Sequence, residues 1–231
     1  MSFPTGEIEK KYEILHKLAE GGMGAVYVVR HRLLGELRVI KIIRPHLAEK
    51  DHLRERFRRE AVAAIRLRHP NIAQIHDFVI DEADVGYSVM ELVDGLTLKE
   101  LLRAGPPPTA FTLEVAAQTL QALGYLHSKG YLHRDVAPDN VMVTGGLDGA
   151  PTVKVIDLGL AKRFADELDL TSSGMFVGKV RYAAPEQFAH PRARLTPTSD
   201  LYAFGLVLYQ QLTGVSPIRG SSFEEVIAGH L

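Results

Sequence analysis

The chain of 231 residues contains no cysteine. Disulfide bonds, thiolate nucleophiles and cysteine-ligated zinc sites are therefore excluded, and the composition is compatible with a reducing cytoplasm, where we expect the protein to be located. An excess of charge of one sign is also absent: the sequence contains 27 lysines and arginines and 28 aspartates and glutamates, which gives a formal net charge of −1. No overall field attracts nucleic acid or an anionic membrane, so we expect neither as a partner.

Long apolar runs are missing too. No run approaches the roughly 18 apolar residues of a membrane-spanning helix, and the opening stretch, MSFPTGEIEKKYEI, lacks the apolar core of a signal peptide. We therefore expect no membrane segment in this chain. The composition, with 46% hydrophobic and 24% charged residues, is ordinary for a globular protein. The length suits one large domain or two small ones.

The first part of the chain has the pattern of an antiparallel sheet. Short apolar runs predict strands at residues 12–18, 25–30, 37–43, 72–78 and 86–92. The first two runs flank a glycine-rich turn, as in a hairpin.

A helix is predicted between the third and fourth of these strands, at residues 51–68. Asp51 is suited to its N-cap, and a His-Pro pair ends it. Glu60 falls on the apolar stripe of this helix, three residues after Phe57 and four before Ala64. A carboxylate that faces inward is costly unless a cation meets it, so we expect a basic partner for Glu60.

Helical patterns dominate the rest of the chain. We predict helices at residues 97–104, 111–129, 198–212 and 222–231. Residues 158–186 form a long irregular stretch, and a loop of that length in a folded domain is usually functional or disordered.

The sequence therefore predicts an α+β fold in two lobes. We expect an N-terminal leader (1–11), a small antiparallel β lobe with one helix (12–90), a hinge (91–95) and a larger, mainly helical lobe (96–231).

Two motifs in the β lobe suggest phosphate binding. The turn AEGGMG at residues 19–24 contains residues without a Cβ, which let backbone N–H groups approach a phosphate, although a plain β-turn explains the same letters. Lys41, in the run RVIKII at residues 38–43, lies among aliphatic residues in a predicted buried strand. An ammonium group there needs an anion unless the strand lies at an edge, and the inward-facing Glu60 favours the first reading.

Two further motifs supply carboxylates. HRDVAPDN at residues 133–140 contains Asp135 and Asn140, and IDLG at residues 156–159 contains Asp157, 22 residues after Asp135. Each residue taken singly has an ordinary explanation, as an aspartate in a turn or an asparagine in a loop. No such ordinary explanation accounts for all eight residues of HRDVAPDN in this order.

The order and spacing of these motifs, followed by APE at residues 184–186, resemble the catalytic domain of Hanks-type serine/threonine protein kinases of bacteria. The resemblance covers nearly the whole chain. It implies a bilobal kinase fold, ATP and Mg²⁺ as cofactors with Mn²⁺ as an alternative, protein substrates phosphorylated on serine or threonine, and autophosphorylation in trans within a dimer.

The resemblance also implies roles for individual residues. Asp135 accepts or orients the substrate hydroxyl, Lys41 contacts the α- and β-phosphates and pairs with Glu60, and Asn140 and Asp157 bind the metal. Asp200 caps the backbone of the catalytic loop. The residues that contact the nucleotide are Ala19, Gly21, Gly22, Gly24, Val26, Val39, Lys41, Met90, Glu91, Val93 and Met142.

The chain departs from the family pattern in several places. Ala19 replaces the first glycine of the loop, Val39 an alanine and Leu158 a phenylalanine. Ala137 stands where these kinases carry a lysine that neutralises the γ-phosphate, whereas Lys179 stands where they carry a threonine. Because the two positions meet at the catalytic aspartate in the family, we predict that Lys179 supplies the cation that Ala137 cannot.

Two further expectations follow from the resemblance. Thr171 and Ser173 precede Lys179 where related kinases autophosphorylate, and Arg134 gives such a phosphate a cation to contact. The chain also ends before the last helices of the family, which carry the arginine partner of Glu186, so we expect Glu186 to lack that counter-ion.

Two other functions are compatible with these motifs. Ala137 and the early end favour a pseudokinase, an ATP-binding scaffold with little or no turnover. A small-molecule kinase of similar fold is disfavoured by the long segment that ends in APE.

Overall fold

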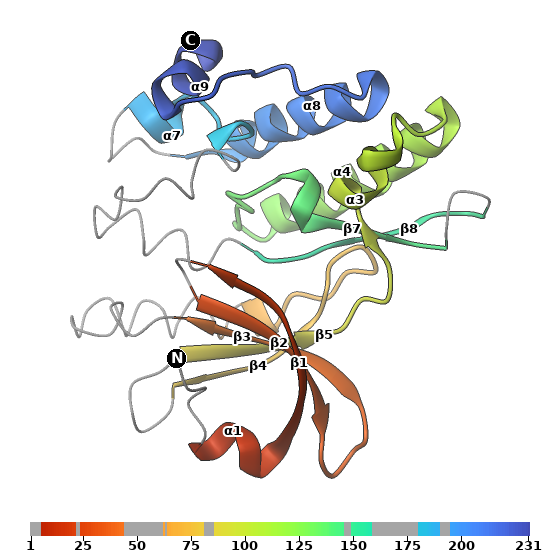
Figure 1. The fold of residues 1–231 in the computed structure, drawn as a ribbon, viewed down its shortest axis with the longest axis vertical. Helices are drawn as coiled ribbons and strands as arrows, with labels where there is room; N and C mark the ends of the chain where they lie inside the picture. Colours follow the sequence, from red (N-terminus) through yellow and green to blue (C-terminus); the bar gives the residue numbers. More distant parts are fainter. Residues whose placement is uncertain are drawn as a thin grey trace. The chain divides into compact units, whose positions relative to one another are not determined.

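The computed structural model describes residues 6–21, 24–43, 62, 64–80, 86–145, 149–158, 180–189 and 195–231 (Figure 1). The chain divides into two units. Unit 1 consists of Met1–Arg68 and Ala73–Leu92, and unit 2 consists of His69–Ile72 and Val93–Leu231. The change of unit after Leu92 falls within the predicted hinge.

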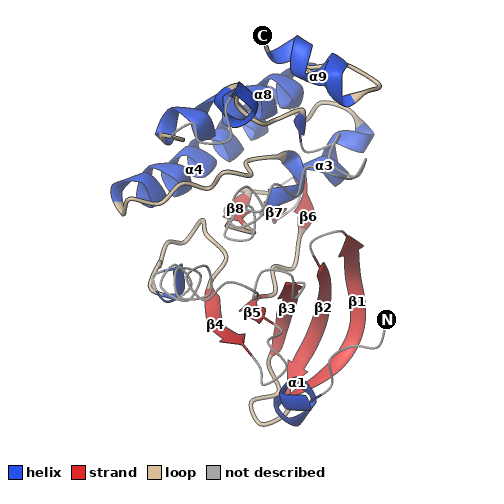
Figure 2. Cartoon of the chain, turned by 90° about the vertical axis from the view of Figure 1, so that its left-hand side faces the viewer, coloured by secondary structure: helices blue, strands red, loops and turns tan. Residues whose placement is uncertain are grey.

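Unit 1 is built on an antiparallel sheet in the order β1-β2-β3-β5-β4 (Figure 2). Its strands are β1 (Tyr12–Gly21), β2 (Gly24–His31), β3 (Leu37–Ile43), β4 (Ile75–Ile80) and β5 (Gly86–Glu91). All five strands were predicted. The fourth strand begins later than expected. Ile72, which was predicted to lie in it, belongs to unit 2 and forms a parallel bridge with Val155 of the same unit.

One face of this sheet carries the core of unit 1. Side chains alternate along a strand, so the buried residues Ile40 and Ile42 of β3 share a face with Tyr87 and Val89 of β5. Helix α1 (Gly6–Lys11) covers this face and contributes Ile8, which is 1% exposed. The predicted leader therefore contains a helix that belongs to the folded unit, because an apolar sheet face must be covered.

Little of the predicted helix at residues 51–68 lies within the described part of the chain. Val62, Ala64 and Ile65 are helical, and Ala64 and Leu67 are buried, as their apolar stripe predicted. Glu60 and Asp51 lie outside the described residues.

Unit 2 is mainly helical, with a small sheet in the order β6-β7-β8. Helix α4 packs against α8 and against β8 (Figure 2). The elements are β6 (Leu96–Thr97), α3 (Leu98–Leu101), η2 (Leu102–Ala104), α4 (Thr109–Ser128), η3 (Pro138–Asn140), β7 (Val141–Thr144), β8 (Thr152–Val155), α7 (Glu186–Ala189), α8 (Pro197–Thr213) and α9 (Phe223–His230). The helices predicted at residues 111–129, 198–212 and 222–231 are present as α4, α8 and α9, whereas the helix predicted at 97–104 is the short α3 followed by the 3-10 turn η2. Helix α7 and the short strands β6 and β7 were not predicted.

The ends of α8 matter because this helix supports the catalytic loop. Thr196 and Ser199 form a reciprocal capping box at its start, with Pro197 at the first position. Gly214, with φ of 76°, ends it in the left-handed conformation, and its N–H donates to the Gln210 carbonyl at 2.8 Å. Within the described residues, the structure has no helix that is both long and apolar enough to cross a membrane.

Candidate active site

Five of the expected nucleotide residues of unit 1 lie on the sheet face opposite its core. Strand register pairs Ala19 with Val26, Val26 with Lys41, and Val39 with Met90. Because cross-strand partners share a face, and so do residues two apart on one strand, all five side chains point to one side of the sheet. An apolar surface with one ammonium group at its edge fits a purine ring attached to phosphates.

The glycine turn also has the backbone that its composition predicts. Gly21 pairs with Gly24 where β1 and β2 meet. Gly24 has φ of 142°, a value that residues other than glycine rarely adopt. Gly22 lies outside the described residues. The turn is thus a hairpin end in which at least one glycine is required by conformation.

Glu91, Val93 and Met142 are placed with less direct roles. The Glu91 carboxylate accepts the Gln74 N–H at 2.9 Å, and the Glu91 N–H donates to the Gln74 carbonyl at 2.8 Å. A contact between Glu91 and a nucleotide would therefore use its carbonyl oxygen. The Val93 side chain is buried and Met142 lies on β7, both in unit 2.

In unit 2 the buried carboxylate of Asp200 organises the catalytic loop. Asp200, on the first turn of α8, is 2% exposed and accepts the backbone N–H groups of His133 at 2.8 Å and Arg134 at 2.7 Å. The His127 ring lies 2.8 Å from the same carboxylate. The capping role predicted for Asp200 is therefore present, and it holds Arg134 in a left-handed conformation, with φ of 65°.

His133 connects the catalytic loop to the segment that carries Asp157. Its Nε2 lies 3.1 Å from the Ile156 carbonyl, which can only accept, so Nε2 carries the proton. Its Nδ1 in turn accepts the Asp135 N–H at 3.2 Å. Asp157 follows with φ of 59°. Among the described residues, Arg134 and Asp157 are the two non-glycine residues with a left-handed backbone conformation. Such conformations cost energy and cluster at functional sites.

Asn140 is fixed in an orientation that suits a metal ligand. Its side-chain N–H donates to the Asp135 carbonyl at 2.6 Å, which determines the end of the amide that bears the oxygen, and its backbone carbonyl accepts the Ile156 N–H at 2.9 Å. The described residues include no cluster of three or more metal-binding side chains. One carboxylate and one amide oxygen fit a magnesium ion that takes its other ligands from phosphates and water.

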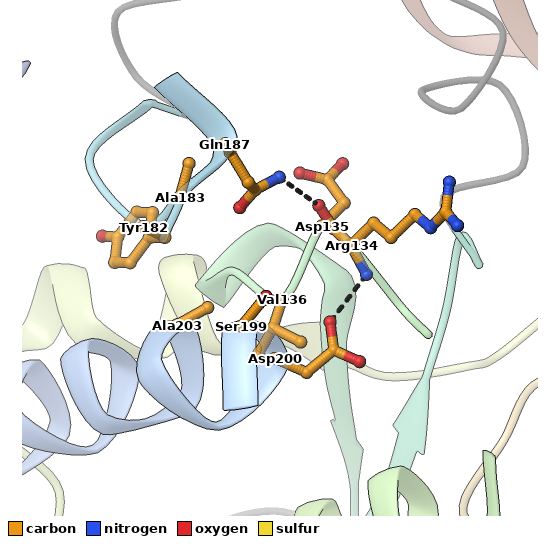
Figure 3. A pocket seen from close by; sticks show the side chains of 9 residues that line it. All are labelled: Arg134, Asp135, Val136, Tyr182, Ala183, Gln187, Ser199, Asp200 and Ala203. Atoms are coloured by element: carbon orange, nitrogen blue, oxygen red, sulfur yellow. Dashed lines mark hydrogen bonds between the residues drawn. The ribbon is translucent and has the colours of Figure 1, made fainter. Parts of the chain in front are cut away.

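A small pocket lies beside Asp135 (Figure 3). Asp135 is 7% exposed, and Gln187 connects the loop to the segment that follows, because its side chain donates to the Arg134 carbonyl at 3.4 Å and accepts the Ala184 N–H at 2.8 Å. The lining residues are Arg134, Asp135, Val136, Tyr182, Ala183, Gln187, Ser199, Asp200 and Ala203. Tyr182 and Ala183 thus lie in the same pocket lining as Asp135.

Tyr182 stays neutral in this pocket. Burial, together with the Asp139 carboxylate, raises the pKa of Tyr182 to about 12, and its hydroxyl donates to the Gln210 side chain. Asp139 itself forms a half-exposed ion pair with Lys99 at 2.8 Å.

Several expected site residues lie outside the described residues: Glu60, Thr171, Ser173 and Lys179. Ala137, the position at which the family carries a lysine, is described and is 1% exposed. Glu186, expected without its arginine, accepts a hydrogen bond from the Ser199 hydroxyl.

Sequence reasoning missed three positions that the structure connects to the site: His127 on Asp200, Gln187 on Arg134, and His230 on the Val180 carbonyl at 2.9 Å. None belongs to a spacing pattern, because each acts through a contact between distant parts of the chain. A signal for His127 existed in its position on the same predicted helix face as the apolar residues.

The support given by Asp200 makes a prediction about stability. We expect Asp200→Ala to lower the free energy of unfolding by about 3 kcal/mol, because two buried N–H groups lose their acceptor. Asp139→Ala, which removes a half-exposed ion pair, is the matched control and should cost less than about 1 kcal/mol. Urea denaturation of both variants measures the difference, and equal costs would contradict the organising role of Asp200.

Comparison with known proteins agrees with this geometry. The chain matches the protein kinase domain family over residues 12–230. It is 37% identical over 225 residues to the serine/threonine-protein kinase PrkC of Bacillus subtilis, covering 97% of this chain and 34% of that protein. It is 36% identical over 228 residues to the serine/threonine-protein kinase PknB of Mycobacterium leprae, covering 97% of this chain and 36% of that protein. The chain thus spans about a third of the length of these relatives.

Solved structures give the same result. The PknI kinase domain of Mycobacterium tuberculosis, crystallised as a variant, is 28% identical with a TM-score of 0.73, over 96% of this chain and 81% of that one. A Rad53 fragment in complex with AMP-PNP is 27% identical with a TM-score of 0.75, over 96% of this chain and 53% of that one. The chain therefore belongs to the protein kinase family, as a Hanks-type domain similar to those of bacterial serine/threonine kinases.

Proposed function

We propose that the chain is an active protein kinase that transfers the γ-phosphoryl group of ATP to serine or threonine hydroxyls of proteins. The observation that carries the proposal is the catalytic loop, in which Asp135 and Asn140 are held by a hydrogen-bond network that leads through His133 to Ile156, the residue before Asp157. A chain selected only as a scaffold has no need of a strained aspartate beside an oriented amide.

The Lys41 ammonium binds the α- and β-phosphates, and the apolar face formed by Val26, Val39 and Met90 receives the adenine. Asn140 and Asp157 would hold a magnesium ion, with manganese as an alternative, and the ion would supply positive charge against the phosphates.

Asp135 acts on the second substrate. Its carboxylate orients the hydroxyl and accepts its proton as the oxygen bonds to the γ-phosphorus. The bond between that phosphorus and the β,γ-bridging oxygen breaks, and ADP leaves. Because charge spreads over the transferred oxygens, a nearby cation lowers the barrier, and we assign this role to Lys179 in place of the residue at position 137.

The competing function is a pseudokinase. Ala137 is the observation that favours it, since a buried methyl group stands at a position that normally carries an ammonium. Every other catalytic position described in the chain has the side chain that turnover requires, so the active enzyme is the better-supported proposal.

Transfer of label from γ-labelled ATP to an acceptor such as casein tests this function. The purified chain should give phosphoserine or phosphothreonine in the presence of Mg²⁺, and Asp157→Ala should reduce the label to background. Nucleotide binding without any transfer would favour the pseudokinase, and label on a small molecule alone would contradict a protein substrate.

Autophosphorylation is a further expected property, with copies acting on one another in trans. After incubation with Mg-ATP, mass spectrometry should find phosphate on Thr171 or Ser173, with Thr171 favoured, because Arg134 offers a cation for it. The chain carrying Asp157→Ala is the control and should remain unmodified. Phosphate at other positions only would contradict this mode of control.

A further inference from the structure

The segment at residues 180–184 is attached to four different parts of unit 2. Val180 is buried in a cluster with Ile218 and Val226 of the loop before α9 and of α9 itself. Arg181 donates to the Gly220 carbonyl at 2.7 Å. Tyr182 and Ala184 bond to Gln210 of α8 and Gln187 of α7, as described above. We call residues 180–184 the docking segment, since two of them line the pocket beside Asp135.

The end of α9 holds this segment through His230. The His230 Nε2 lies 2.9 Å from the Val180 carbonyl, and its Nδ1 lies 2.9 Å from the Tyr202 hydroxyl. A carbonyl oxygen can only accept, so Nε2 carries the proton and Nδ1 accepts from Tyr202. The ring therefore forms a two-bond bridge from α8 to the docking segment, in a neutral state.

The surroundings stabilise that state. Burial lowers the pKa of His230, although the hydrogen bond to Val180 opposes the change, and burial with the nearby Glu186 charge raises the pKa of Tyr202. Both shifts favour the neutral ring and the protonated hydroxyl that the bridge requires. The Phe188 ring lies 5.6 Å from the His230 ring and covers it from α7.

We propose that His230 is a positioning residue for phosphotransfer, acting through the Val180 carbonyl to place the docking segment beside Asp135. The inference rests on the proposed kinase function and assigns this helix end to substrate placement. Val180 also follows Lys179 in the chain, and its carbonyl accepts the Ala183 N–H at 3.1 Å, so one atom joins the bridge to the turn that carries Tyr182 and Ala183. A merely structural helix end would need neither contact.

Three variants separate positioning from folding. His230→Phe keeps an aromatic ring against Phe188 but removes both hydrogen bonds. His230→Gln keeps a donor that reaches the Val180 carbonyl. Tyr202→Phe removes only the donor to Nδ1. Glu224→Gln, a change at an exposed position of the same helix, is the control.

We expect His230→Phe to lower kcat/KM for a protein substrate about three- to tenfold, while KM for ATP is unchanged, because only the lost neutral hydrogen bond to the Val180 carbonyl reaches the docking segment. His230→Gln should recover most of the loss, and Tyr202→Phe should add little to His230→Phe, because both act through one bridge. Equal activity of His230→Phe and wild type, or equal losses in His230→Phe and His230→Gln, would overturn the proposal.

Hydrogen exchange gives a readout that does not require turnover. Amides of residues 181–184 should exchange about tenfold faster in His230→Phe than in the wild type, whereas amides in the middle of α4 should not change. If the wild type transfers no phosphate, the proposed function fails while this comparison still decides the bridge. Unchanged exchange at residues 181–184 would overturn it.

Discussion

Replacing Lys41 by methionine is expected to abolish phosphotransfer, with a loss of at least about a hundredfold in rate, while the fold is retained. Lys41 is paired with Val26 and Ser88 on the sheet face opposite the core of unit 1, so we expect its ammonium to contribute to ligand binding and little to packing. Methionine keeps the apolar stem of the side chain and removes the terminal ammonium group.

The control for this variant is Lys10→Met, which removes a lysine from the exposed surface of α1. It should leave the rate unchanged, and both variants should keep the wild-type melting temperature. A Lys41→Met protein that is folded and fully active would show that the ammonium does not contact the phosphates.

Replacing Lys179 by threonine restores the usual family residue and is nevertheless expected to be harmful. If Lys179 provides the only cation that compensates for Ala137, its loss should lower the rate about a hundredfold, the effect of one electrostatic donor of about 3 kcal/mol. KM for ATP should change little, because the interaction strengthens only as the phosphoryl group is transferred. Lys10→Thr is the matched control. A rate in Lys179→Thr equal to that of the wild type would show that Lys179 does not supply the compensating cation.

Much of the fold could be read from the sequence because local patterns determined it. The five strands of unit 1 follow from runs of apolar residues, and α8 follows from a Thr-Pro start and a glycine end. Helix α1 was not predicted, because six residues with one buried isoleucine give no periodic signal. The helix is explained by the apolar face of the sheet, which must be covered and against which Ile8 packs.

The candidate site divides in the same way. Asp135, Asn140 and Asp157 were predicted because their motifs, in order and spacing, resemble the kinase signature. The His230 bridge joins residues 50 positions apart and depends on how α9 packs, so no local pattern contains it. The hydrogen bond that the Ser199 hydroxyl donates to Glu186 likewise joins separate segments and was not predicted.

The claim on which the proposed activity depends is that Lys179 replaces the lysine missing at position 137. Ala137 is 1% exposed, so a lysine introduced there must displace its neighbours, and the melting temperature of Ala137→Lys should be recorded alongside its activity.

The decisive measurement is the rate of phosphotransfer by the double variant Ala137→Lys, Lys179→Thr, compared with Lys179→Thr alone. We expect the double variant to recover much of the hundredfold loss, as two groups that share one role are coupled. A folded double variant that remains as slow as Lys179→Thr would contradict the replacement of one cation by the other.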